Sequence, residues 1–288
     1  MAPADHDADA TTALPPATHI GRTALRVESL DTVVPFYRDI VGFNVRRDGS
    51  RARLLAGDEP LMLLKETSDG ADRTADAAGL FHVAVRVPSR AALGDALERI
   101  RSRDGPLTGA SDHLVSEALY LRDPEDNGVE IYRDLPRETW TWIDDDTVDI
   151  DTLPLDLDPI AAEATGGDTL PADTDIGHIH LETTDLGRAE SFYVDRLGFQ
   201  VRSRYGDEAT FLAAGRYHHH IGLNTWNDRR SPAGSGSGLA WFEVVVPNRE
   251  TRERLRTSLT ERGYATDVEN GVLRVTDPDN ITVRLVVE

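Results

Sequence analysis

The stretch FYRDIVGF at residues 36–43 recurs as FYVDRLGF at residues 192–199. Each copy follows an apolar run with strand-like alternation, at residues 23–27 and 178–183, and then a segment that starts a helical pattern. Self-similarity of this kind is the signature of a fold built from repeated units. The sequence therefore predicts that one strand–helix unit occurs at least twice in the chain.

A second pair of repeats is offset from the first. VRVPSR at residues 85–90 resembles VVVPNR at residues 244–249, and an amphipathic helical pattern follows each. An Asp-Pro pair, at Asp123 and again at Asp277, then marks a turn before the last strand of each unit. Together the two pairs predict four modules, each a strand, a helix and three strands, at residues 19–67, 80–135, 176–226 and 238–288.

The modules set the expected domain boundaries. Residues 1–18 are polar, and we expect a disordered lead-in that is not a secretory signal. Residues 19–135 are expected to form an N-terminal domain of two modules, and residues 176–288 a C-terminal domain of two more. Residues 136–175 are acidic and contain prolines, which is typical of a connector.

The charge of the chain is strongly negative. The net charge is −20, and Lys65 is the one lysine among 31 basic residues. An acidic, lysine-poor surface is typical of adaptation to a high-salt cytoplasm, where carboxylates keep a protein hydrated and salt screens their repulsion. A surface for a basic partner is the alternative, although the acidic residues are scattered. Nucleic acid is not an expected partner, because phosphate binding needs a basic patch.

The composition also limits the chemistry. The chain has no cysteine, which excludes disulfides, thiol catalysis and cysteine-ligated metals. Any metal must be held by His, Asp or Glu, and these ligands favour a hard or borderline ion. No apolar run reaches 18 residues, so we expect no membrane span and a cytoplasmic location.

The four-module pattern resembles the vicinal oxygen chelate superfamily, which includes glyoxalase I, fosfomycin-resistance proteins and type I extradiol dioxygenases. The resemblance implies an α+β fold in which four βαβββ modules pair into two incomplete barrels. It also implies that the cup of a barrel binds a divalent metal through residues on the first and last strands of its modules. Because fold alone does not fix chemistry, the ligand positions must decide the function.

Aligned first strands place four residues at one position: Arg22, His82, His178 and Trp241. Aligned last strands place four others together: Met62, Glu130, Gly222 and Arg284. The resemblance therefore implies a metal site made by His82, Glu130 and His178. Two histidines and one carboxylate suit Fe(II), with Mn(II) as the alternative ion. His180 faces the same side of its strand as His178 and is the rival ligand, while a purely structural role for either histidine is the bland alternative.

The ligand positions also predict which modules pair. The set is complete only if the second and third modules share a barrel, either within one chain or between two chains. Pairing of the first with the second module would leave the site without His178. The oligomeric state is open, although members of the family often form dimers or tetramers.

The run YHHHIGLN at residues 217–224 resembles a histidine segment of extradiol dioxygenases. The resemblance implies that His219 is the acid–base catalyst, and a histidine suits this task because its ordinary pKa lies near neutrality. His218, His220 and His180 are expected to contact the substrate. An adventitious metal site or a surface feature is the alternative interpretation of the triple histidine.

The stretch SDHLVSEALY at residues 111–120 resembles the second signature of the same enzymes. It implies catalytic roles for Tyr120, which would hydrogen-bond a substrate oxygen, and for His113 behind it. The spacing between these two residues is about two residues shorter than in the biphenyl-type enzymes, so the reach of His113 stays open. Ordinary packing is the alternative for Tyr120.

The resemblance as a whole implies an extradiol ring-cleaving dioxygenase of the catechol 2,3-dioxygenase type. Such an enzyme takes a small aromatic diol and O₂ at Fe(II) and releases a muconic semialdehyde. A hydroquinone-type ring-cleaving dioxygenase is the nearest alternative. A glyoxalase-type isomerase is less consistent with Gly222, because that class places a second carboxylate in this slot. A ligand-binding protein without catalysis is the remaining alternative.

Overall fold

The computed structural model describes residues 13–67 and 73–288. Residues 1–12 of the expected disordered lead-in lie outside the described residues. Residues 13–18 correct that expectation, because they pack against the protein. The side chain of Leu14 is 4% exposed, and its N–H donates a hydrogen bond to the carbonyl of Gly198 at 2.8 Å. Burial of this one apolar side chain gives the segment a fixed place.

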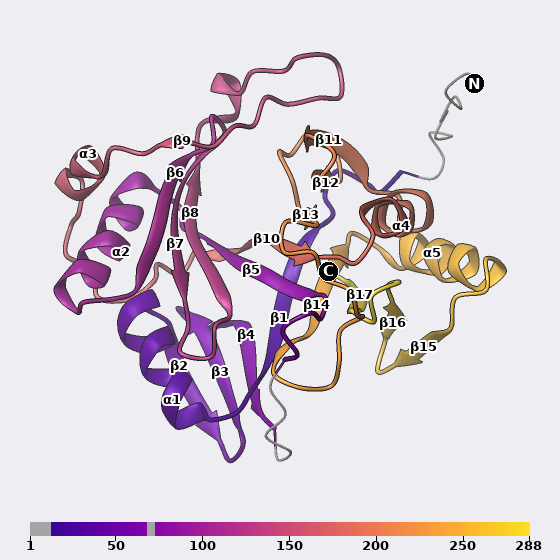
Figure 1. Ribbon diagram of the computed structural model, residues 1–288, viewed down its shortest axis with the longest axis horizontal. Helices are drawn as coiled ribbons and strands as arrows, with labels where there is room; N and C mark the ends of the chain where they lie inside the picture. The colour runs from indigo at the N-terminus through magenta and orange to yellow at the C-terminus, as the bar shows by residue number, and fades with distance from the viewer. Residues whose placement is uncertain (1–12, 68–72) are drawn as a thin grey trace.

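The first and fourth modules form one curved sheet of eight strands (Figure 1). Its central contact is the antiparallel pair β1–β14, and each of these strands has the last strand of its own module as a parallel neighbour. The order across the sheet is β15 (Thr266–Glu269), β16 (Val272–Thr276), β17 (Thr282–Val287), β14 (Gly238–Val246), β1 (His19–Val27), β4 (Glu59–Glu66), β3 (Arg51–Ala56) and β2 (Asn44–Asp48).

The second and third modules form the other sheet, with the same arrangement around the antiparallel pair β5–β10. The structure thus confirms the α+β class and the pairing of the two central modules, within one chain. Each sheet takes one module from either side of the connector, so the two halves of the chain interleave. The order is β11 (Gln200–Tyr205), β12 (Ala209–Ala213), β13 (Ile221–Asn224), β10 (Asp175–Glu182), β5 (Gly79–Arg86), β8 (Gly128–Asp134), β7 (Ser116–Arg122), β6 (Leu107–Asp112) and β9 (Leu153–Pro154).

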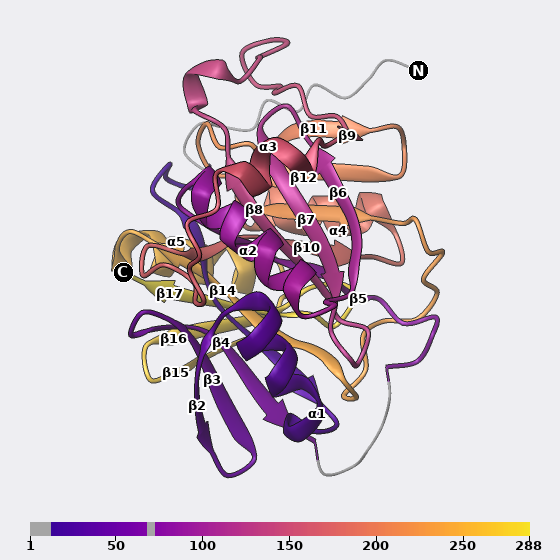
Figure 2. The ribbon, with the colours of Figure 1, turned by 90° about the vertical axis from the view of Figure 1, so that its left-hand side faces the viewer.

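The helices lie on the outside of the sheets, which leaves the inner faces free for sites (Figures 1 and 2). The VPSR and VPNR repeats begin the two long helices, because Ser89 and Asn248 accept hydrogen bonds from backbone N–H groups of the first turn. Within the described ranges, no helix has the length and apolar character needed to cross a bilayer. The helical segments are α1 (Leu30–Pro35), η1 (Phe36–Val41), α2 (Arg90–Ser102), η2 (Arg137–Thr139), α3 (Leu157–Ala162), α4 (Leu186–Ser191), η3 (Phe192–Arg196) and α5 (Arg249–Glu261).

The FYRDIVGF/FYVDRLGF repeat contacts the Asp-Pro repeat at two places between the sheets. We call these two tyrosine–aspartate hydrogen bonds the latch. Tyr37 of the FYRDIVGF copy donates a hydrogen bond to Asp123 of the next module, and Tyr193 donates to Asp277 in the same way, both at 2.9 Å. Each tyrosine is fully buried in the helical segment of a module of one sheet, whereas its aspartate lies in a turn of a module of the other sheet. The repeats therefore mark contacts that hold the two sheets together.

We predict that Tyr193→Phe destabilises the protein by about 1.5–3 kcal/mol, the range for a hydrogen bond to a charged group. The substitution removes one donor from the buried Asp277 carboxylate and leaves the ring packing in place. Urea unfolding measures the change. Tyr205→Phe is the matched control, because Tyr205 is 53% exposed and should leave stability unchanged. Equal effects of the two substitutions would contradict the latch.

The latch also predicts a pH dependence. Burial raises the pKa of Asp277 from its ordinary 3.8 to about 6. Between about pH 3.8 and pH 6, Asp277 is therefore protonated in the folded protein and ionised in the unfolded chain. The contribution of Asp277 to stability is full below pH 3.8 and is lost as the pH rises through 6. The free energy of unfolding of the native chain, minus that of Asp277→Asn, should fall between about pH 4 and pH 6. A difference that rises over this interval would contradict the assignment.

Candidate metal centre

Three side chains from three adjacent strands meet on the inner face of the nine-stranded sheet. His82 lies on β5, Glu130 on β8 and His178 on β10. The Nε2 atom of His82 lies 2.9 Å from Oε2 of Glu130 and 3.3 Å from Nε2 of His178, and the third side of this triangle is 3.1 Å. Two ligands at right angles on a metal about 2.1 Å away lie about 3 Å apart, so one ion fits against all three atoms.

The protonation of these groups also fits a metal. Burial lowers the pKa of His178 to about 4, so its ring is neutral near pH 7. Burial acts to raise the pKa of Glu130, but the adjacent His178 and His82 lower it more, so that carboxyl is ionised. Neutral imidazoles and an ionised carboxylate are the forms that bind a divalent ion. Among the described residues this is the one group of three such ligands within mutual reach.

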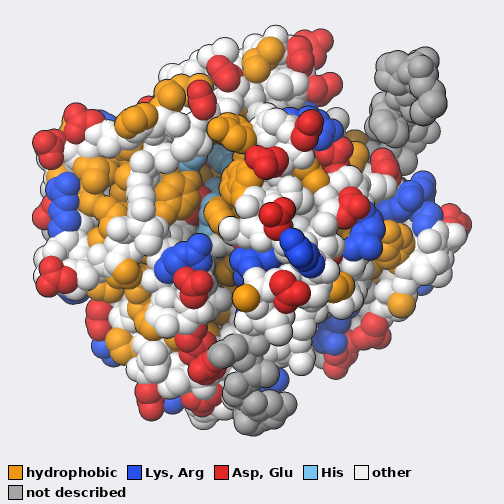
Figure 3. Space-filling view, in the orientation of Figure 1, with side chains coloured by type: hydrophobic (Ala, Val, Ile, Leu, Met, Phe, Trp, Pro, Cys, Tyr) orange, Lys and Arg blue, Asp and Glu red, His pale blue; other side chains and the backbone are white. Residues whose placement is uncertain are grey.

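A cavity of about 450 Å³ opens in front of the three ligands. In the space-filling view the histidines form the floor of a hollow near the centre of the face, and apolar side chains surround it (Figure 3). This volume is in the range of sites for small organic molecules. The wall is mainly apolar and aromatic, with contributions from Phe81, Leu121, Val129, Ile150, Phe211 and Trp226.

His180 lines the cavity but differs from His178 in its contacts. Its Nε2 lies 3.0 Å from the side-chain nitrogen of Asn224, and its ring packs against both Phe81 and Trp226, which also contact each other. It is absent from the three-ligand group. A Cβ added at Gly222 would approach the His180 ring to 2.8 Å, so the ring occupies the space that a side chain at position 222 would need.

The residues expected to be catalytic line the same cavity. The ring of His219 packs against that of His178, with centroids 4.1 Å apart and planes inclined by 47°, and the centroids of Tyr120 and His82 are 5.7 Å apart. The hydroxyl of Tyr120 lies 2.6 Å from Nε2 of His113. Two polar groups thus flank the two histidines of the metal site, one beside each.

The two hydrogen bonds of His113 determine in which direction the Tyr120 hydroxyl donates its proton. Nδ1 of His113 lies 2.6 Å from the carbonyl oxygen of Asp151, which can only accept, so this nitrogen carries a proton. In the neutral ring Nε2 then accepts the proton of the Tyr120 hydroxyl. Burial and the nearby Glu130 raise the pKa of Tyr120 well above its usual value. The phenol keeps its proton, and its free lone pair faces the cavity.

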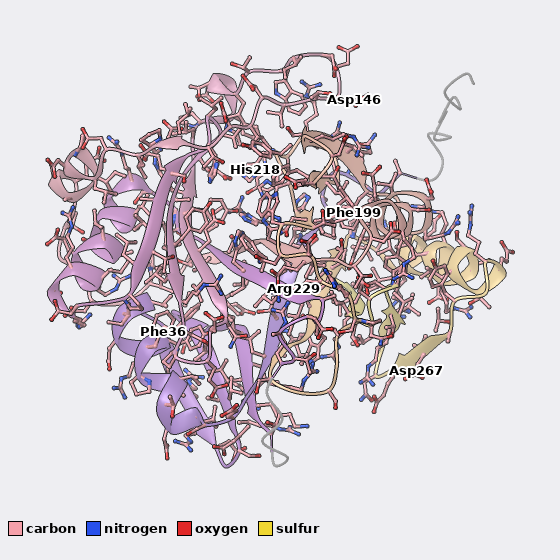
Figure 4. All side chains as sticks on the ribbon, in the orientation of Figure 1. Phe36, Asp146, Phe199, His218, Arg229 and Asp267 are labelled. Atoms are coloured by element: carbon pink, nitrogen blue, oxygen red, sulfur yellow. The ribbon has the colours of Figure 1, made fainter. Side chains whose placement is uncertain are left out.

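His218 and His220, both expected to contact the substrate, are not among the described residues that line the metal cavity. His218 has no exposed surface and lies behind His219 in the interior, between the second and third modules (Figure 4). His220 lines a separate cavity of about 160 Å³ together with Arg86 and Arg216. Of these three histidines, only His219 lines the metal cavity.

Among its described residues, the eight-stranded sheet carries no such ligand set. Parallel pairing places Leu63, not Met62, opposite Ala24, which is the position that Glu130 holds opposite Ala84 in the other sheet. The alignment of Met62 with Glu130 was wrong by one residue, and Met62 faces the core with 2% exposure. An ion pair between Arg22 and Glu243 and a stacked contact of Arg284 on Trp241 occupy the remaining positions.

Two parts of the cavity wall are missing from the prediction. Phe81 precedes His82 and would face away from it in a regular strand. The register jumps from His180–His82 to Leu181–Leu80, so Phe81 is an extra residue in a β-bulge and turns toward the cavity. The connector supplies the other part through Ile150, Asp151 and Thr152, next to the bridge of β9 to β6. Neither feature has a signal in the sequence pattern.

Comparison with known proteins agrees with this geometry. Residues 19–131 and 175–285 match the model of the Glyoxalase/Bleomycin resistance protein/Dioxygenase superfamily. The chain is 40% identical over 273 residues to a catechol-2,3-dioxygenase of Bacillus subtilis, covering 91% of this chain and 94% of the relative. It is 28% identical to biphenyl-2,3-diol 1,2-dioxygenase 3 of Rhodococcus globerulus over 49% of this chain and 78% of that one.

A solved structure from Bacillus subtilis shares the fold, with a TM-score of 0.66 at 12% identity over 96% of this chain and 86% of that one. The chain belongs to the Glyoxalase/Bleomycin resistance protein/Dioxygenase superfamily, and it is an enzyme of the extradiol dioxygenase class. The buried His-Glu-His group is its candidate metal centre.

We predict that His178→Ala lowers the affinity of the metal-free protein for a divalent ion by more than about 100-fold, because even outer contacts of a metal site are worth 10–100-fold. His180→Ala is the matched control and should change the affinity far less, since its ring belongs to the cavity wall. Calorimetric titration with Mn²⁺ measures both. A larger loss of metal affinity in His180→Ala than in His178→Ala would mean that His180 is the ligand and His178 is part of the cavity wall.

Proposed function

We propose that this protein is an Fe(II)-dependent extradiol dioxygenase that opens the ring of a catechol next to its two hydroxyls, with a muconic semialdehyde as product. The observation that carries the proposal is the face of three donor atoms at mutual distances of 2.9–3.3 Å, open on one side to a largely apolar cavity. Two histidines and one carboxylate with open positions suit Fe(II) enzymes that use O₂.

A bound Fe(II) would supply one centre at which both oxygens of the diol and O₂ are held together and exchange electrons. His82, Glu130 and His178 would hold it on one side only. The aromatic wall would receive the ring and exclude water from the reacting groups. Mn(II) accepts the same ligands, so the metal requires direct measurement.

Tyr120 and His219 would divide the proton chemistry between them. Because the Tyr120 hydroxyl donates to His113, its free lone pair can accept a hydrogen bond from a substrate hydroxyl. Burial lowers the pKa of His219 well below its usual value, so this ring is neutral in the resting protein. A neutral base beside the metal can accept the proton of the diol and return it during ring opening.

The packing of His180 argues against a glyoxalase-type activity. That chemistry would need a second carboxylate at position 222, and the His180 ring fills the space that such a side chain would enter. A non-catalytic binding role would not require His219 and Tyr120, two groups able to exchange protons, beside the candidate metal centre. The ring-cleaving proposal uses both features.

The test is anaerobic purification with Fe(II), followed by addition of catechol and air. We expect stoichiometric iron and a yellow ring-cleavage product. His219→Ala should keep its iron and lose about 10²–10⁴-fold in kcat, the usual contribution of a general acid–base group. Iron content by atomic absorption and product absorbance measure the two effects.

Native protein that holds iron but forms no ring-cleavage product with catechol or substituted catechols would contradict the proposed function. Loss of iron in His219→Ala would instead mean that His219 is a ligand, and its assigned role would be wrong.

A further inference from the structure

A chain of hydrogen bonds runs from His219 away from the cavity. Nδ1 of His219 lies 2.7 Å from Nδ1 of His218, and Nε2 of His218 lies 2.9 Å from Oδ1 of Asp134. Asp134 is the last residue of β8, the strand that carries Glu130. Within the described chain, Nε2 of His219 makes no hydrogen bond and is left for the cavity.

Asp134 is held as an ionised carboxylate. Its other oxygen accepts from Arg86 at 3.0 Å, and Tyr217 donates to the same group at 3.2 Å. Burial acts to raise the pKa of Asp134, but the hydrogen bond from His218 and the hydrogen bond and charge of Arg86 outweigh this effect, so the pKa lies below its ordinary value. An ionised carboxylate only accepts hydrogen bonds, so Nε2 of His218 must carry a proton.

The proton position on His218 then determines the proton position on His219. When His218 carries one proton, the contact with Asp134 places that proton on Nε2, and Nδ1 is a lone pair that can only accept. The 2.7 Å contact with His219 therefore requires the proton to sit on Nδ1 of His219. The remaining nitrogen of His219, Nε2, is then the unprotonated one, and it faces the metal cavity.

We propose that Asp134 and His218 are positioning residues that lock His219 in the tautomer with a bare Nε2, so that the base is available to the substrate before any metal or diol binds. The catalytic consequence rests on the proposed function of His219, whereas the tautomer itself does not. Neither residue touches the cavity, and both act through the ring that does.

Asp134→Asn should reverse donor and acceptor at each step of this series of hydrogen bonds. Arg86 only donates, so the amide oxygen of the new side chain would face Arg86 and its NH₂ group would face Nε2 of His218. That nitrogen must then accept, His218 donates from Nδ1, and His219 carries its proton on Nε2. Asp175→Asn is the matched control, because Asp175 pairs with the same arginine without contacting His218.

The tautomer is read directly by ¹⁵N NMR of the metal-free protein labelled at histidine, because protonated and bare ring nitrogens have well-separated shifts. The His219 signals are assigned from their absence in His219→Gln. We expect a bare Nε2 in the native protein and in Asp175→Asn, and a protonated Nε2 in Asp134→Asn. His218→Ala, which removes the partner altogether, should let both tautomers appear and serves if Asp134→Asn does not fold.

The same variants, loaded with Fe(II), test the consequence with catechol as probe. Asp134→Asn should keep its metal affinity and KM and lose about 10²–10⁴-fold in kcat, the range of general acid–base catalysis. A bare Nε2 on His219 in Asp134→Asn, or a doubly protonated His218 in the native protein, would overturn the proposal that Asp134 and His218 fix the tautomer of His219. A reversed tautomer with unchanged kcat would leave the lock standing and overturn the role of His219.

Discussion

The antiparallel pairing of β5 with β10 is the contact on which the rest of the site depends. Its register places His82 opposite His180 and Ala84 opposite His178, so His82 and His178, the two histidines of the candidate centre, lie diagonally across the strand pair. Glu130 joins them because β8 runs parallel to β5 with Glu130 beside Ala84. A shift of one residue would turn one histidine to the opposite face of the sheet. The candidate metal centre is therefore a property of strand register, and its three side chains come from both sides of the connector.

The other sheet shows what this register produces when the residues differ. It has the same parallel and antiparallel neighbours, but an arginine–glutamate pair and an arginine–tryptophan contact stand at the equivalent positions. The two sheets are tied by the Tyr37–Asp123 and Tyr193–Asp277 latches. One sheet thus carries the candidate site, while the other is joined to it by these two buried hydrogen bonds.

Much of this could be predicted from the sequence, because repeats constrain topology strongly. The four modules and the pairing of the central two followed from positions that recur in each copy, and the structure brings His82, Glu130 and His178 within 3.3 Å of one another. What escaped prediction depends on departures from regular geometry. The bulge that turns Phe81 inward and the connector segment that closes the cavity have no periodic signal, and the alignment of Met62 shifted because its strand carries no ligand to anchor it.

The central claim is that one metal ion binds to residues from both halves of the chain. Anomalous diffraction at the iron edge, on crystals of protein loaded anaerobically with Fe(II), tests it most directly. We expect one strong peak about 2.1 Å from Nε2 of His82, Nε2 of His178 and a carboxylate oxygen of Glu130, a usual metal–ligand distance. A peak held by ligands from one half alone, or none at this triangle, would contradict the account.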